Sequence, residues 1–142
     1  MKRIGRFFLL LVLLGSPAGA QDVPSSGFPI HDRYVVAALD GHHFGADASL
    51  TVKRRMADNS LYAEGDAGCG WWVAAVELGA RNAFRVVGVQ SASLECPHAN
   101  LEKAFLAALK KVTRWRLEGR NLLLEGNGVR LRLDPRPAAN WI

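Results

Sequence analysis

Five residues of this chain have side chains that could do chemistry together: Cys69, Cys96, His42, His43 and His98. A cysteine beside a histidine could act as a nucleophile, because the imidazole accepts the thiol proton and holds the thiolate at neutral pH. No sequence signature of a Cys–His enzyme surrounds either cysteine, and no nucleophile elbow surrounds any serine. We therefore expect no catalytic residues and no enzymatic activity.

The same residues are ligand types of a zinc site, with Cys69, Cys96, His98 and either His42 or His43 as the four donors. Only one residue separates Cys96 from His98, which is tighter than the usual gap between neighbouring zinc ligands. We expect no metal and no cofactor, with His42 and His43 in a solvated turn. Whether the two cysteines pair with each other depends on the compartment in which the protein resides.

The first twenty residues, "MKRIGRFFLLLVLLGSPAGA", indicate export. A basic start precedes an unbroken apolar run over residues 7–14, and small residues end the segment at Ala18-Gly19-Ala20. This is the pattern of a cleaved signal peptide, and the apolar run is far shorter than the roughly 20 residues that a membrane span needs. We expect a signal peptide over residues 1–20, a periplasmic or secreted protein, and no transmembrane anchor after cleavage.

Export favours a disulfide between Cys69 and Cys96, because the only two cysteines of an exported chain meet an oxidising environment. The alternative is a pair of small buried thiols that do not meet. Cys69 precedes an expected strand and Cys96 precedes an expected helix. A bridge would therefore tie one end of the helix to the sheet.

Net charge does not indicate a nucleic-acid partner. Cleavage removes Lys2, Arg3 and Arg6 from 18 Lys and Arg, which leaves 15 against 13 Asp and Glu and lowers the net charge from +5 to about +2. Basic residues cluster at 53–55, 110–111 and 114–120, but acidic residues are interspersed among them. We expect a solvated surface there and no binding of nucleic acid.

Short segments with alternating apolar residues predict seven or eight strands in one domain, residues 34–134, between a lead-in (21–33) and a tail (135–142). The expected strands lie at 34–39, 49–53, 60–65, 71–78, 84–90, 114–118, 121–125 and 129–133. Their spacing leaves no room for crossover helices, so the sheet should be antiparallel. Gly126-Asn127-Gly128 suits a tight turn before the last strand.

One segment follows a helical period instead. Apolar residues recur three and four positions apart and predict an amphipathic helix whose apolar face packs on the sheet. The residues of this face are Leu101, Ala104, Phe105, Ala108, Leu109 and Val112. The charged residues Glu102, Lys103, Lys110 and Lys111 are expected on the opposite face. Asn100 could be the N-cap, or Pro97 could open a slightly longer helix. The fold class is thus α+β, a curled antiparallel sheet packed on one helix.

Tryptophans give the candidate binding surface: Trp71, Trp72 and Trp115. Adjacent Trp71 and Trp72 must point to opposite faces of a strand, so one should enter the core and the other should be exposed. The sequence does not say which. An exposed aromatic patch would favour a binding surface, and a cavity behind the inward ring would favour a small ligand.

Two motifs resemble the META domains, the HslJ-like proteins. "GDAGCGWWVAAVEL" (65–78) is similar to the Gly-Cys-Asn motif and following strand of that family, and "ECPHANLEKAFLAALKKVTRWRLEGRNLLLEGNG" (95–128) is similar to its Cys-Pro motif, helix and final hairpin. Three features depart from the family: Tyr34 stands where Trp is usual, Gly70 replaces the Asn, and no lipobox cysteine is present. The glycine at position 70 puts a side-chain cap at that turn in doubt, and the missing lipobox cysteine puts a lipid anchor in doubt.

The resemblance implies an open or cracked barrel around one helix in a bacterial envelope protein of a family without established catalytic activity. Relatives have been linked to heat-shock response and drug resistance. We therefore expect a non-catalytic exported protein that supports stress tolerance by binding a protein or envelope partner through its sheet or the rim of its open barrel. The alternative is an apolar-ligand or lipid binder that uses the space between helix and sheet.

Overall fold

The computed structural model describes residues 27–92 and 94–136. These residues form nine strands, a short 3-10 turn at Ala80–Asn82 and one α-helix, α1, at Ala99–Lys111. The strands are β1 (Arg33–Leu39), β2 (His42–His43), β3 (Ser49–Arg54), β4 (Leu61–Asp66), β5 (Trp71–Gly79), β6 (Ala83–Ala92), β7 (Arg114–Glu118), β8 (Asn121–Gly126) and β9 (Val129–Pro135). The expected signal peptide, the first residues of the lead-in and most of the tail lie outside the described residues.

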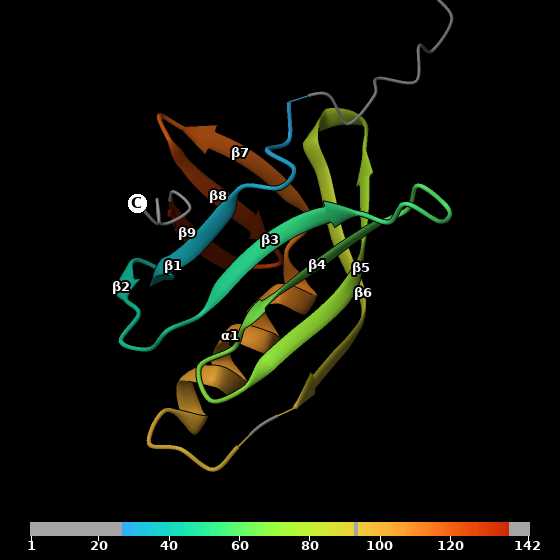
Figure 1. Ribbon diagram of the computed structural model, residues 1–142. Helices are drawn as coiled ribbons and strands as arrows, with labels where there is room; N and C mark the ends of the chain where they lie inside the picture. Colours follow the sequence, from blue (N-terminus) through green and yellow to red (C-terminus); the bar gives the residue numbers. More distant parts are fainter. Residues whose placement is uncertain (1–26, 93, 137–142) are drawn as a thin grey trace, which may run out of the picture.

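All pairs are antiparallel, in the order β2-β1-β3-β4-β5-β6-β7-β8-β9, and β1 also pairs with β9. The sheet therefore curls into a ring (Figure 1). The ring is nearly open between β6 and β7, where Ala83 and Arg114 form the one strand pair. This arrangement confirms the expected α+β fold, a curled antiparallel sheet on one helix.

Period-2 alternation explains most of the strands. In β9, Leu131 and Leu133 are fully buried while Arg130 and Arg132 are exposed, as the sequence predicted. The turn before β9 has positive φ at Gly126, Asn127 and Gly128 (149°, 49° and 80°). Backbone of this kind suits glycine and asparagine and closes a tight hairpin.

The sequence reading missed β2. His42 and His43 were expected in a turn, but they pair with Leu39 and Ala38 of β1. Asp40 and Gly41 have φ of 51° and 81°, which are the backbone angles of a two-residue hairpin loop, and an Asp-Gly pair favours this loop. Both histidines are exposed. The sheet therefore has nine strands instead of seven or eight.

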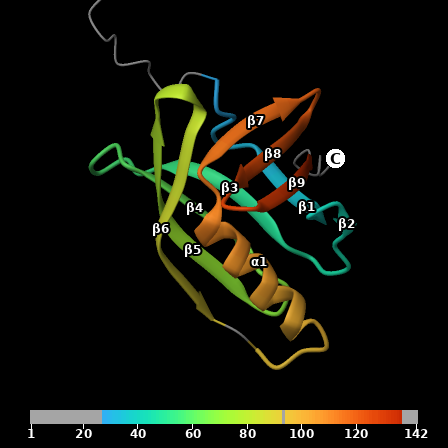
Figure 2. The same cartoon turned by 180° about the vertical axis from the view of Figure 1, so that it is seen from behind.

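Helix α1 covers the inner side of the sheet (Figure 2). It begins at Ala99, with His98 as an N-cap whose side chain makes no capping hydrogen bond. The expected cap at Asn100 is therefore wrong, because the helix already includes that residue. Cys96 Sγ accepts the backbone N–H of His98 at 3.3 Å, so the chain before the helix is held through the sulfur.

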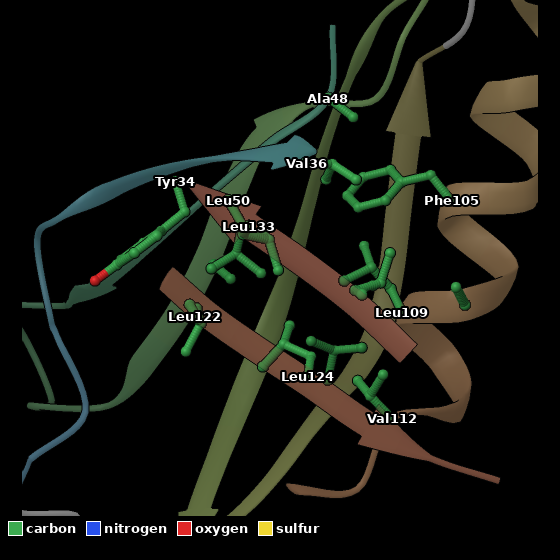
Figure 3. Close-up of a cluster of buried hydrophobic side chains, with 14 of the residues drawn as sticks. Tyr34, Val36, Ala48, Leu50, Phe105, Leu109, Val112, Leu122, Leu124 and Leu133 are labelled. Atoms are coloured by element: carbon green, nitrogen blue, oxygen red, sulfur yellow. The ribbon is translucent and has the colours of Figure 1, made fainter. Parts of the chain in front are cut away.

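Side chains from the sheet and the helix meet in one core (Figure 3). Phe105 and Leu109 of α1 are fully buried, and Val112 just beyond the helix is almost so. Trp72 packs edge-on against Phe105, with ring centroids 5.9 Å apart. Phe28, in the expected lead-in, is also buried. Packing therefore starts before Tyr34, the expected first residue of the domain.

Candidate functional site

The two adjacent tryptophans of β5 face opposite sides of the sheet. Trp71 is 52% exposed, whereas Trp72 is fully buried. The Trp72 indole N–H donates to the Ser49 carbonyl oxygen at 2.9 Å, so even its polar atom has a partner inside the protein. The expectation that one ring enters the core and the other is exposed is correct.

Of the three tryptophans in the candidate binding surface, only Trp71 can contribute an exposed ring. Trp115 on β7 is 8% exposed and packs edge-on against Phe28, with ring centroids 5.1 Å apart. Trp72 packs on the helix. Both belong to the core, because their neighbours on strands and helix enclose them. The candidate surface is therefore the outer face of the sheet around Trp71.

The strand register builds this surface from separate parts of the chain. Arg33, Thr51, Glu64 and Val73 form one row across β1, β3, β4 and β5. Asp66 pairs with Trp71 in the next row. Figure 2, which is seen from behind, shows α1 in front of β5, so the outer face around Trp71 is turned away from the helix.

A groove of about 530 Å³ runs over these rows. The side chains along it include Arg33, Thr51, Lys53, Glu64, Asp66 and Trp71. We call this hollow the Trp71 groove. Aromatic, charged and hydroxyl groups all line it, so it offers both a flat apolar surface and hydrogen-bonding partners.

The charges in the Trp71 groove are paired. Arg33 Nη2 lies 3.5 Å from Asp66 Oδ2, and Lys53 Nζ donates to Glu64 Oε1. The hydrogen bond to Glu64 raises the pKa of Lys53 above its ordinary value, and the charge of Glu64 adds to this. Two cations therefore balance two anions in the groove.

Gly65 lies beneath this surface and has a steric role. Its partner across the strands is Trp72, and a Cβ at Gly65 would collide with the Ser49 carbonyl oxygen. Ser49 Oγ also accepts the backbone N–H of Asp66 at 2.9 Å. Because glycine has no side chain, β3 and β4 can approach closely at this point. This close approach helps to position Asp66 and Trp71 on the outer face of the sheet.

The turn before Trp71 is held by a residue that the sequence reading placed wrongly. Glu102 was expected on the solvated face of the helix, but it is only 4% exposed. Its Oε2 accepts the backbone N–H groups of Cys69 at 2.7 Å and Gly70 at 3.0 Å. Its spacing from Phe105 and Leu109, three and seven residues, was the signal for burial.

Cys69 in this turn and Cys96 before the helix are joined by a disulfide, with Cα atoms 5.6 Å apart. This is the pair that the sequence reading selected. A disulfide leaves neither sulfur as a thiolate nucleophile or a zinc ligand, so the Cys–His and zinc alternatives lose their cysteines. Within residues 27–92 and 94–136, no three His, Cys, Asp or Glu side chains gather in a way that could hold a metal ion.

The space between helix and sheet, which the alternative reading assigned to an apolar ligand, is filled by the protein. Phe105 lies between Trp72 and Phe44, with ring centroids 5.9 Å and 6.2 Å away. Leu109 and Val112 fill the next turn and the end of the helix against the leucines of β8 and β9 (Figure 3). An apolar ligand there would have to displace packed side chains.

Comparison with known proteins gives a family and a fold. The family model described as "META domain" matches residues 29–138. An NMR structure of a protein from Burkholderia xenovorans is 20% identical, with a TM-score of 0.62 over 77% of this chain and 84% of that chain. Another NMR structure is 15% identical, with a TM-score of 0.57 over 73% and 88%. Among proteins of curated function, the comparison finds no match.

Proposed function

This chain belongs to the META domain family, and from that premise we propose that it is a non-catalytic, exported protein that binds a protein or another envelope component through the Trp71 groove. The proposal includes a role in stress tolerance, which rests on the family resemblance. The half-exposed ring of Trp71 carries the argument.

Trp71 has no internal task that accounts for its side chain. Among the residues that the structure describes, none forms a ring contact or a hydrogen bond with its side chain. A large ring that leaves about half its area to water forgoes the stabilisation that burial gives, roughly 25 cal/mol for each Å² left exposed. Tryptophan is enriched at binding sites, where it often dominates the affinity.

Export is supported by the leader sequence and by the disulfide. Structural disulfides persist in oxidising compartments and are rare in the cytosol. The described part of the chain contains no helix of the length and apolarity that a membrane span needs. A periplasmic or secreted location is therefore part of the proposal.

The rim of the ring offers a second contact for the same partner. Beyond the pair Ala83–Arg114, no described strand pairs with the outer edge of β6. Phe84 N–H points to that side, because it donates to the Thr113 carbonyl oxygen, and Val86 has the same orientation by alternation. An extended segment of a partner could add to this edge of β6. The segment would then run along β6 toward Ala92, which lies opposite Trp71 and six residues beyond Val86.

Site-specific photo-crosslinking in living cells tests the proposal. A photoreactive amino acid replaces Trp71 in one variant and Leu117 in the control, because Leu117 on β7 is also exposed but lies outside the Trp71 groove. We expect a discrete adduct from position 71 and none of the same size from position 117. The same adducts from both positions would contradict a binding role for the groove.

The stress role has its own test. In the source bacterium, a strain lacking this protein should grow less well after heat shock. The wild-type gene should restore growth, while Trp71→Ala should not, at equal protein level. Full rescue by Trp71→Ala would separate the stress role from the groove.

A further inference from the structure

We infer that the Trp71 groove binds a neutral polysaccharide chain by stacking a sugar ring on the exposed indole of Trp71. This inference rests on the proposed function and names the chemistry of the envelope component. The aromatic ring, the balanced charges and the length of the groove support it independently of one another.

The first step is the shape of the aromatic group. Trp71 presents a flat ring on the open face of a strand, and its indole N–H has no acceptor among the described residues. A sugar ring has one face made of C–H groups and a rim of hydroxyl groups. The C–H face fits against the negative face of an aromatic ring, and the free N–H can donate to a hydroxyl oxygen.

The second step is charge. The groove holds Arg33 and Lys53 against Asp66 and Glu64, each cation already paired with an anion. The two cations and two anions balance, so the groove has no net charge that would attract an ionic ligand. The hydroxyls of a neutral polyol can accept from the cations and donate to the carboxylates at the same time.

The third step is length. Trp71 on β5 and Arg33 on β1 lie three strand spacings apart, which is about 14 Å at the usual separation of strands. Thr51 lies between them and adds a hydroxyl that can donate or accept. The groove is therefore longer than one sugar ring, and a chain of sugars can contact the indole and the charged pairs together.

The test is a titration of the purified protein followed by NMR of the tryptophan indole N–H signals. The Trp71 signal is assigned from its loss in Trp71→Phe. The probes are the tetramer of β-1,4-linked N-acetylglucosamine and maltotetraose, with an oligogalacturonate as the anionic comparison. We expect one of the neutral tetramers to shift the Trp71 signal in a saturable way and to leave the signals of Trp72 and Trp115 nearly unchanged.

Variants make the outcome specific. Their affinities are measured by isothermal titration calorimetry, because the Trp71 signal is absent from two of them. Trp71→Ala should raise the dissociation constant at least tenfold, Trp71→Phe should retain part of the affinity, and Leu117→Ala should bind as the wild type does. Absence of a saturable shift with both neutral tetramers at millimolar concentration would overturn the inference. Preference for the anionic probe, or full binding by Trp71→Ala, would overturn it as well.

The failure of this inference can be told apart from the failure of the proposed function. If the sugars do not bind but crosslinking at position 71 gives a discrete protein adduct, the partner is a protein and the proposed function stands. If position 71 also gives nothing beyond position 117, the proposed function fails too.

Discussion

Glu102 is a buried acidic residue that connects the helix to the sheet. Its carboxylate accepts two adjacent backbone N–H groups from the turn that begins β5, at 2.7 Å and 3.0 Å. Hydrogen bonds to a charged acceptor are stronger than neutral ones, and two of them share one oxygen here. In this chain Gly70 replaces the family's Asn, and the carboxylate of Glu102 holds the backbone of that turn.

Glu102→Gln should lower the free energy of unfolding by about 1 to 3 kcal/mol, because a neutral amide replaces the charged acceptor in a buried position. Glu118→Gln is the matched control, since Glu118 is exposed and its nearest cation, Arg116, lies 3.8 Å away. We expect less than about 0.5 kcal/mol there. Urea unfolding of both variants measures the difference, and equal losses would show that Glu102 does not hold the turn.

The position of Glu102 could be predicted from the sequence only in part. The spacing of Glu102 from Phe105 and Leu109 puts it on the buried face of the helix, but its charge suggested the solvated face. Its partners are backbone N–H groups more than thirty residues away, and no side-chain pattern records them. Residue type alone therefore gave the wrong position for a buried carboxylate with backbone partners.

At the scale of the elements, the apolar face of α1 supplies much of the core. Phe105→Ala should cost about 3 to 5 kcal/mol, because Phe105 is fully buried against Trp72 and Phe44. Lys110→Ala, on the exposed face, should cost less than about 0.5 kcal/mol. Urea melts of the two variants compare them, and similar costs would mean that the helix packs through a different face.

The three consecutive antiparallel strands β7, β8 and β9 should contribute less to the free energy of unfolding in acid. Arg116 Nε donates to Glu125 Oε1 at 2.7 Å, and this hydrogen bond, with the charges of Arg116 and Arg130, lowers the pKa of Glu125 despite partial burial. A carboxylate with a lowered pKa stabilises the fold above its unfolded pKa, and this stability is lost as the pH falls through the folded value.

Glu125→Gln should therefore reduce the loss of stability on acidification below about pH 4.5, compared with the wild type. Unfolding free energies measured at neutral pH and at about pH 3 give the comparison. Glu77→Gln provides the control, because the pair between Glu77 and Arg85 is exposed at both ends. An unchanged pH dependence in Glu125→Gln would contradict the role of the Arg116 pair.

Periodicity identified eight strands and the helix, because alternation and helical spacing survive wherever one face of an element is buried. Strand β2 has only two residues, both exposed, so it leaves no such pattern. The expected N-cap, Asn100, lies two residues beyond the observed one, His98, because the chain before the helix is held by the Cys96 sulfur and not by a capping side chain.

At the scale of the whole molecule, the disulfide ties the turn before β5 to the chain before α1. Cys69 and Cys96 are 27 residues apart, and chain entropy gives a stabilisation of about 3 to 4 kcal/mol for a loop of this size. The double variant Cys69→Ser, Cys96→Ser should lose about that much in urea unfolding. The single variant Cys69→Ser should lose no less, since it also breaks the bridge.

Intact mass after alkylation checks the bridge itself. Denatured protein, purified without reductant, should take up no label, and reduced protein should take up two. Two labels without reduction would contradict the disulfide. That result would also return both cysteines to consideration as metal ligands.

The exposed tryptophan could be predicted only in part. Alternation required Trp71 and Trp72 to face opposite sides, but the choice between them depends on how the whole sheet curls. Trp115 sits in an alternating strand as well, and its burial depends on Phe28, which comes from the other end of the chain. The groove joins four strands through their register, and a local pattern does not contain that information.

The ring closes where β1 meets β9, with Val36 opposite Leu133. During synthesis β1 cannot complete its pairing until β9 has left the ribosome, and β9 emerges after nearly all the rest of the chain. Pairs so distant in sequence form slowly, since the chain loses the most entropy in bringing them together. The nascent protein thus stays without its complete fold until translation is almost finished, a delay that suits the export we propose.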